Sequence, residues 1–340
     1  MVRLFSGVLA QARYIVGALA LTFVLAVATP ALAQQQTPLA NNPTASAVQE
    51  DQLLRQLRVI DGRVSIPDQQ SRNLQQPGRD WREFHQTTLR WISAIVILGA
   101  LAAIVVFYLS RGMVKIENGR SGRTVVRFNA LERFVHWMTA TCFIILALSG
   151  LNITFGKSLL APVIGLDAFA AWSQLLKYAH NYLSFPFTLG VVLILLLWIS
   201  GNIPGKADVE WVKSGGGLFG KDHPPAPRFN AGQKLIYWVV ILGGLASAIT
   251  GYILMFPFYA TDVAGMQTAQ SIHGIVAALF IAIMLGHIYI GSIGMEGAFE
   301  AMGEGTVDEN WAKQHHSLWL EEEKRRGAPT GATPHGAPAE

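Results

Sequence analysis

Four histidines lie inside or at the ends of long apolar stretches of this chain: His136, His180, His273 and His287. An ionisable side chain at membrane depth is costly, so such residues indicate a function. His273 and His287 share one stretch and are 14 residues apart (287 − 273). In a helix that spacing is about 40° short of four turns, so both imidazoles project from nearly the same face, about 21 Å apart along the axis. One helix therefore offers a nitrogen near each face of a bilayer.

The alternating direction of successive spans predicts the partners of these two residues. His136 lies early in a span that leaves the cytoplasm, and His287 lies late in one that returns to it. His180 and His273 each lie in the first turns of a span that enters from outside. Two histidine pairs stacked in a helical bundle favour bis-imidazole ligation of two b-type haems.

Two other interpretations of these histidines remain open. Each could be a hydrogen-bonded contact between helices. The four could also line a metal-ion pathway, but hard cations need carboxylates. Glu132 and Asp262 lie only at span ends, and no acidic residue lies at mid-membrane. These observations favour haem over a cation pathway.

The composition supports a membrane protein and limits the redox chemistry. Of 340 residues, 51% are hydrophobic and 14% are charged, whereas soluble domains carry about 25% charged residues. Cys142 is the single cysteine, which excludes an internal disulfide, a four-cysteine iron–sulfur cluster and c-type haem attachment. The net charge of +4 does not indicate nucleic acid binding, because the basic residues flank apolar spans.

Apolar and polar stretches divide the chain into five parts. An exported amino terminus is indicated by basic residues, an apolar run and an Ala31-Leu32-Ala33 cleavage site, although an uncleaved membrane helix is the alternative. The predicted parts are a signal peptide (1–33), an extracytoplasmic polar segment (34–87), an extra transmembrane helix (88–110), a dihaem cytochrome b domain (125–325) and a disordered tail (326–340).

The five predicted spans each have about the 20 residues that cross a bilayer. They cover 88–109, 130–153, 182–199 (helical from near Ser173), 233–256 and 269–290. Lysine and arginine are concentrated after the first, third and fifth spans. The positive-inside rule then places these segments, and the carboxyl terminus, in the cytoplasm.

Further residues near the histidines suggest roles in ligand binding. Asn230 is a good helix N-cap at the cytoplasmic end of the fourth span, and Gly232 exposes backbone N–H groups that suit a quinone carbonyl. A plain helix cap is the alternative. Arg133 and Lys177 could meet haem propionates or only reach the interface. Five glycines could make room for porphyrin: Gly150, Gly190, Gly251, Gly274 and Gly286. The adjacent His315 and His316 could bind a metal, cap a helix or contact a partner.

Several short strings in residues 125–325 resemble the gamma, cytochrome b subunit of membrane-bound formate dehydrogenase. The Asn-Ala-Gly-Gln-Lys and Trp-Ala-Lys-x-His-His strings make the resemblance fairly specific. The matching strings are Arg127-Phe128, Glu132-Arg133-Phe134-Val135-His136-Trp137, Ala147-Leu148-Ser149-Gly150, Asn202-Ile203-Pro204, Phe229-Asn230-Ala231-Gly232-Gln233-Lys234, Ser271-Ile272-His273, Gly286-His287-Ile288-Tyr289, Glu304-Gly305 and Trp311-Ala312-Lys313-Gln314-His315-His316.

The resemblance implies an all-α integral membrane bundle of four core helices that hold two b haems, here with one extra amino-terminal transmembrane helix. It implies haem ligation by His136 with His287 on the cytoplasmic side and by His180 with His273 on the periplasmic side. Quinone contacts fall on Asn230 and Gly232.

The resemblance also implies a place in a complex of the bacterial inner membrane. A separate molybdenum or tungsten alpha subunit oxidises formate, and an iron–sulfur beta subunit passes electrons to the outer haem. The chain would then be the electron-transfer and quinone-reducing subunit. A cytochrome b subunit of a hydrogenase or thiosulfate reductase, or a haem-free membrane anchor or transporter, remains an alternative. The signal peptide, the polar segment and the extra span depart from the simplest family pattern.

Overall fold

The computed structural model describes residues 81–217, 224–327 and 331–332. The predicted signal peptide (1–33), residues 34–80 of the polar segment and most of the predicted tail (326–340) lie outside the described residues.

Five long helices form the framework, in agreement with the all-α membrane bundle expected from the sequence. They are α5 (Leu89–Arg111), α6 (Ala130–Leu151), α9 (Leu166–Trp198), α11 (Ala231–Met255) and α12 (Val263–Tyr289). With the helical turns that flank them, each is long and apolar enough to cross a membrane. Shorter turns flank these helices: η2 (Phe84–Thr88), η3 (Asn152–Gly156), α7 (Lys157–Leu159), α8 (Ala161–Ile164), η4 (Ile199–Gly201), η5 (Gly215–Gly217) and η6 (Ile290–Gly294).

Side-chain caps fix where three of these helices begin. Asn129 caps α6 in a reciprocal capping box with Glu132, and Asn230 caps α11 in the same way with Gln233. The Asp262 carboxylate accepts a hydrogen bond from the Gly265 N–H at the start of α12. Each cap satisfies backbone N–H groups that the first turn of a helix leaves without a helical partner.

Two helices begin earlier than the sequence predicts. Helix α9 begins at Leu166 rather than near Ser173, and α12 begins at Val263 rather than at Ala269. Hydropathy locates the apolar part of a helix, whereas caps and turns locate its ends. His273 therefore lies in the third turn of α12, not in its first, and His180 lies in the fourth turn of α9.

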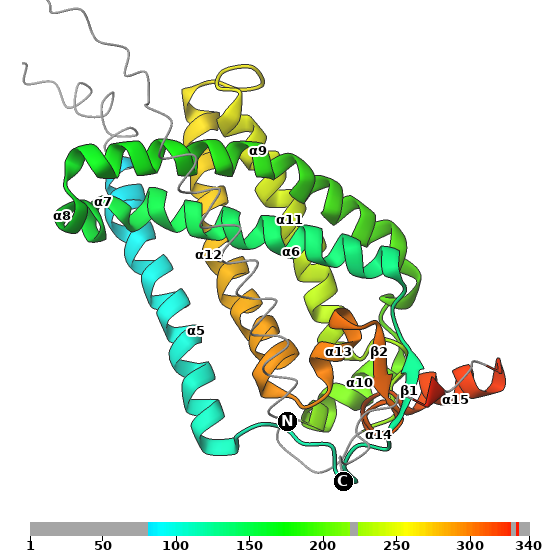
Figure 1. Ribbon diagram of the computed structural model, residues 1–340. Helices are drawn as coiled ribbons and strands as arrows, with labels where there is room; N and C mark the ends of the chain where they lie inside the picture. The colour runs from blue at the N-terminus through cyan, green and yellow to red at the C-terminus, as the bar shows by residue number, and fades with distance from the viewer. Residues whose placement is uncertain (1–80, 218–223, 328–330, 333–340) are drawn as a thin grey trace, which may run out of the picture. The chain divides into compact units, whose positions relative to one another are not determined.

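The four helices α6, α9, α11 and α12 pack as two hairpins, with α5 against the second (Figure 1). Helix α6 packs along α9, α11 packs along α12, and α9 also contacts α11. Helix α5 approaches α12 closely at Gly274, where an added Cβ would lie 2.7 Å from Leu89 Cδ2. A side chain at Gly274 would therefore require the Leu89 side chain to move.

One end of the bundle carries a small mixed cap that the all-α expectation did not include. It consists of a three-stranded antiparallel sheet in the order β2-β1-β3 and short helices (Figure 1). The register pairs Val125 of β1 with Val307 of β2. We call this the sheet end; its elements are β1 (Arg123–Val126), α10 (Lys206–Lys213), α13 (Ala298–Gly303), β2 (Thr306–Asp308), α14 (Glu309–His315), α15 (Ser317–Arg325) and β3 (Gly331–Ala332).

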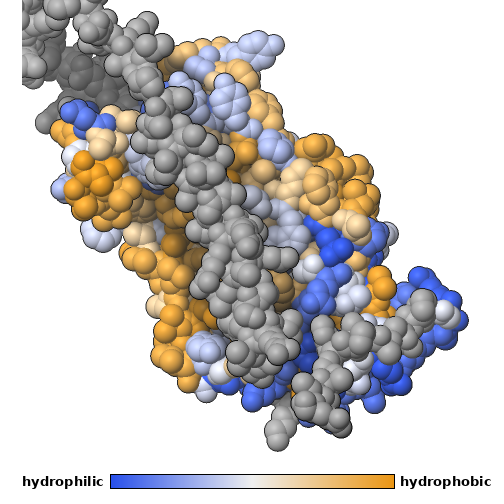
Figure 2. All heavy atoms as spheres, in the orientation of Figure 1, coloured by the Kyte–Doolittle hydropathy of each residue, from blue (hydrophilic) through white to orange (hydrophobic). Residues whose placement is uncertain are grey.

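The outer faces of the long helices are apolar. Leu98, Leu148, Leu196 and Leu242 are all at least 60% exposed. Figure 2 shows hydrophobic side chains over the helical part of the molecule and hydrophilic ones gathered at the sheet end. An apolar exterior over helices of this length suits contact with lipid.

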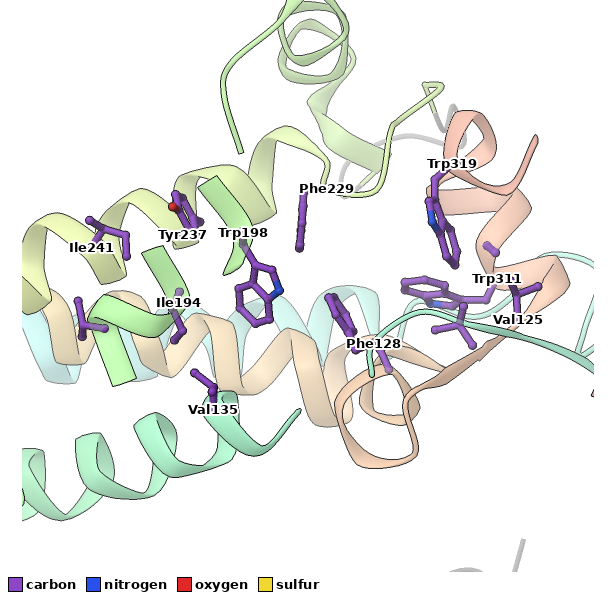
Figure 3. Close-up of a cluster of buried hydrophobic side chains, with 14 of the residues drawn as sticks. Val125, Phe128, Val135, Ile194, Trp198, Phe229, Tyr237, Ile241, Trp311 and Trp319 are labelled. Atoms are coloured by element: carbon purple, nitrogen blue, oxygen red, sulfur yellow. The ribbon is translucent and has the colours of Figure 1, made fainter. Parts of the chain in front are cut away.

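Aromatic side chains join the bundle to the sheet end (Figure 3). The rings of Phe128, Trp198 and Phe229 lie 5.6 to 6.0 Å apart between centroids. They come from the segment before α6, the end of α9 and the segment before α11. This cluster holds together the start of α6, the end of α9 and the start of α11.

Candidate functional site

The pair nearer the sheet end joins α6 to α12. The ring centroids of His136 and His287 lie 6.2 Å apart, and the ring planes are inclined by 62°. The structure thus brings together two histidines that are 151 positions apart (287 − 136). The two imidazoles come from different helices and lie close enough that both could bind one metal ion.

The second pair joins α9 to α12 toward the opposite end of the bundle. His180 and His273 have ring centroids 6.2 Å apart and an interplanar angle of 68°. Ser149 Oγ lies 2.8 Å from His180 Nδ1, and Thr250 Oγ1 lies 2.9 Å from His273 Nδ1. Sequence reasoning missed both hydroxyl contacts, although Ser149 belongs to one of the matching strings.

The spacing within each pair fits a metal ion between two imidazoles. An imidazole nitrogen lies about 2 Å from a bound transition metal, so two opposed nitrogens are about 4 Å apart. Each ring centre lies about 1 Å behind its nitrogen, which gives about 6 Å between centroids. Both pairs have this separation. Among the described residues, no group of three or more histidine, cysteine or acidic side chains could hold a metal ion.

The five glycines that were predicted to make room for porphyrin have three kinds of surroundings. A Cβ at Gly150 would lie 3.6 Å from His180 Cε1, and one at Gly251 would lie 3.3 Å from His273 Cε1. Gly190 faces Thr139, and Gly274 faces Leu89, so these two permit close helix contacts. An added Cβ at Gly286 would meet no atom within 4 Å. Gly150 and Gly251 thus serve the histidines directly.

The predicted quinone segment is a helix start covered by an indole. Asn230 Oδ1 accepts a hydrogen bond from the Gln233 N–H at 3.0 Å. The Trp211 ring lies against Gly232, because an added Cβ there would be 2.9 Å from Trp211 Cη2. A buried ion pair of 2.8 Å between Lys234 Nζ and Asp208 ties α10 to α11. Trp211 and Asp208 were not expected from the sequence.

Arg133 does not extend freely toward the aqueous phase. Its Nη1 donates to the Gly303 carbonyl at 2.9 Å, and its Nε is buried without a hydrogen-bond partner in the described part of the chain. Part of this guanidinium is therefore available to an anionic group, while the rest anchors α6 to α13. A role toward haem propionates stays a prediction for Arg133 and for Lys177.

A cluster of charged and polar side chains lies at the sheet end. We call it the buried cluster; it consists of Arg127, Arg228, His316 and Glu132. Arg127 Nη2 donates to the Arg228 carbonyl at 2.6 Å and lies 3.1 Å from His316 Nε2. His316 Nδ1 lies 2.8 Å from the Pro227 carbonyl, which can only accept, so His316 Nε2 accepts from Arg127. His316 thus makes its hydrogen bonds within its own chain, a role that the sequence analysis did not consider for it.

Burial sets the protonation of this cluster. It lowers the pKa of Arg127 to about 9, with a further contribution from the nearby charge of Arg228. Burial, and then the charge of Arg127, hold the pKa of His316 well below its ordinary value. His316 is therefore neutral at pH 7, as its hydrogen bonds require. The guanidinium of Arg127 also lies over the rings of Phe128, Trp311 and Trp319, at 4.8 to 5.4 Å.

Comparison with known proteins agrees with this arrangement. Residues 127–305 match the family described as prokaryotic cytochrome b561, a range that contains all four paired histidines. The formate dehydrogenase cytochrome b556(fdo) subunit of Escherichia coli K12 is 28% identical over 206 residues, which is 59% of this chain and 94% of that protein.

Two further relatives have similar coverage. The nitrate-inducible formate dehydrogenase cytochrome b556(Fdn) subunit of Escherichia coli K12 is 27% identical over 59% of this chain and 92% of that protein. The formate dehydrogenase cytochrome b556 subunit of Haemophilus influenzae is 27% identical over 62% of this chain and 88% of its own length. The resemblance inferred from the short strings is thereby confirmed.

Proposed function

The chain belongs to the prokaryotic cytochrome b561 family, and from this premise we propose that it is the membrane cytochrome b subunit of a formate dehydrogenase complex. Its family and its five apolar helices make it a multi-pass bacterial membrane protein. The finer assignment rests on one observation. Two histidine pairs, both with ring centroids 6.2 Å apart, share the helix α12 at positions about 21 Å apart along its axis.

We assign one haem b to each pair: His136 with His287 at the sheet end, and His180 with His273 toward the opposite end. Bound haem would supply one-electron oxidation and reduction at each level. The chain's part is to hold each pair of imidazoles at a fixed separation within an apolar bundle. The close approach of His180 to Gly150 and of His273 to Gly251, and the hydroxyl partners of both histidines, support this role.

The orientation of the proposed subunit follows from its basic loops. Arg120, Arg123, Lys206 and Lys324 all lie at the sheet end, which the positive-inside rule places in the cytoplasm. Electrons would then enter at the His180–His273 level from an iron–sulfur subunit. A molybdenum or tungsten subunit would oxidise formate, and quinone would be reduced at the sheet end.

This proposal predicts a defined result with the purified complex. The preparation should contain iron–sulfur and molybdenum or tungsten subunits and about two haems b per copy of this chain. Formate should reduce both haems, and added quinone should reoxidise them, as followed in the visible spectrum. Reduction by hydrogen but not by formate would assign the chain to a hydrogenase, and thiosulfate-dependent oxidation would assign it to a thiosulfate reductase. A complex without haem would indicate that the chain is a membrane anchor or a transporter.

We place the quinone beside Asn230 and Gly232 at the start of α11. A helix N-terminus presents backbone N–H groups and a positive dipole end, which favour the charge that a quinone oxygen gains on reduction. Trp211 covers Gly232, so its indole would contact the quinone ring or move aside for it. Sequence reasoning gave the helix start, and the structure adds the aromatic side chain that lies over it.

The substitution Asn230→Asp tests this placement because aspartate caps a helix as well as asparagine does. We expect at least a tenfold loss of quinone reduction, because the amide donor is replaced by a negative charge. Formate should still reduce both haems, and thermal stability should stay within about 0.5 kcal/mol of the parent chain. Asn129→Asp, which makes the matched change at the α6 cap, is the control. Unchanged quinone reduction by Asn230→Asp would contradict the placement.

A further inference from the structure

A serine or threonine followed by glycine faces each histidine of the pair that is farther from the sheet end. Ser149-Gly150 lies near the end of α6 and meets His180 of the next long helix. Thr250-Gly251 lies near the end of α11 and meets His273 of the next helix. Both hairpins therefore build the same local arrangement, in which the glycine admits the ring and the hydroxyl contacts Nδ1.

The direction of these hydrogen bonds follows from what each hydroxyl already does. Ser149 Oγ donates to the Ile145 carbonyl at 2.7 Å, and Thr250 Oγ1 donates to the Ala246 carbonyl at 2.6 Å. A hydroxyl has one hydrogen, so each oxygen accepts from the Nδ1–H of its histidine. We assign the Nδ1–H tautomer to His180 and His273 on this ground, which leaves Nε2 of both rings without a proton and able to bind a metal.

The pair at the sheet end differs in this respect. His136 Nδ1 is buried and has no hydrogen-bond partner in the described part of the chain. His136 is followed by Trp137, whose indole Nε1 donates to the Met302 carbonyl at 2.9 Å. His136 therefore lacks the hydroxyl contact that His180 and His273 both make.

We propose that Ser149 and Thr250 are positioning residues for the two axial imidazoles of the haem at the His180–His273 level, and that they lower its reduction potential. The proposal rests on the proposed haem ligation. Each hydroxyl, together with a backbone carbonyl one turn earlier on the same helix (Leu146 for His180, Ser247 for His273), holds the tautomer and the ring orientation of its histidine. An accepted Nδ1–H bond also makes the imidazole a stronger electron donor, which stabilises ferric more than ferrous iron.

A lower reduction potential at the His180–His273 level affects the direction of electron transfer. Electrons that arrive from a partner at the His180–His273 level would move toward a level whose ligand His136 has no such hydroxyl acceptor. The difference in ligand basicity thus favours transfer toward the sheet end. Neither hydroxyl gains or loses a proton; each accepts a hydrogen bond from its histidine while it donates one to a backbone carbonyl.

The test uses the full chain with its haems, in the purified complex, and the variants Ser149→Ala and Thr250→Val. Thr250→Val replaces a hydroxyl by a methyl group of similar shape. In a redox titration followed in the visible spectrum, each variant should raise the potential of one haem. The two together should change its oxidised-to-reduced ratio at a fixed potential about tenfold, or about 59 mV for a one-electron couple. The low-spin ferric electron paramagnetic resonance signal, which depends on the angle between imidazole planes, should change with it.

Two controls separate this role from packing. Ser271→Ala removes a hydroxyl that donates to the Gln267 carbonyl on α12, two residues before His273, and should leave both potentials unchanged. Thr250→Ser keeps the acceptor and should behave like the parent chain. If both Ser149→Ala and Thr250→Val keep two haems with unchanged potentials, the inference is wrong while the haem assignment stands. If the parent chain holds no haem, the proposed function itself is wrong.

Discussion

Replacement of His287 by alanine is expected to remove the haem held at the sheet end and to leave the other haem in place. The ring centroids of His287 and His136 lie 6.2 Å apart, so the substitution would leave one imidazole of the pair that is proposed to hold this haem. The haem content of the purified chain should fall from about two to about one per chain. The absorbance of haem extracted as its pyridine complex measures this ratio.

Pairs of substitutions test which histidines act together. His136→Ala should remove the same haem as His287→Ala, so the double variant should keep about one haem, because coupled residues are not additive. Combining His136→Ala with His273→Ala should remove both. His85→Ala changes a histidine that stacks on Trp81 and should keep both haems. A folded His287→Ala chain with its full haem content would refute the ligand assignment.

Replacement of Glu132 by alanine is expected to cause the largest loss of stability outside the haem ligands. The Glu132 carboxylate accepts hydrogen bonds from Arg228 Nη2 and Trp198 Nε1, both at 2.8 Å, and from the Asn129 N–H at 2.9 Å. Its removal leaves two arginines close together without a carboxylate. Breaking a buried pair costs about 3–5 kcal/mol, and we expect about 3 because the Arg228 side chain is 35% exposed.

The measurement is the midpoint of thermal unfolding in detergent, where this loss corresponds to about 10 °C. Glu132→Gln keeps the shape and can still complete the α6 cap, so it should lose less than half as much. Glu322→Ala removes an exposed partner of Arg326 on α15 and should cost under about 0.5 kcal/mol. Equal midpoints for Glu132→Ala and Glu322→Ala would show that the buried cluster does not hold the sheet end to the bundle.

The extra helix α5 shows that hydropathy predicts the position of a helix in the sequence but not its packing partners. The sequence predicted a span at 88–110, and the structure has a helix at Leu89–Arg111. Nothing in the sequence indicated that Leu89 would pack into the space above Gly274 of α12, one residue from His273. The span is a local property of one stretch, whereas its docking depends on the position of a glycine that is 185 residues away in the sequence (274 − 89).

The sheet end is a part of the fold that the sequence did not predict. Its strands are three and four residues long in β2 and β1, too short for a periodic signal in the sequence. The strings that begin at Arg127 and at Trp311 resemble those of the family, but the sequence did not show what these residues do. The structure shows that Arg127 and His316 hydrogen-bond each other within a shared aromatic cluster.

The sequence by itself determined the five apolar spans of the described residues, their alternating direction and the sharing of one helix by His273 and His287. These follow from the rise of a helix, the thickness of a bilayer and the distribution of basic residues, which all act along the chain. Tertiary structure decided which side chains meet each imidazole: Ser149 at His180, Thr250 at His273, Trp211 at Gly232. Such contacts depend on the rotation and crossing of neighbouring helices, and these are set by packing between segments far apart in the sequence.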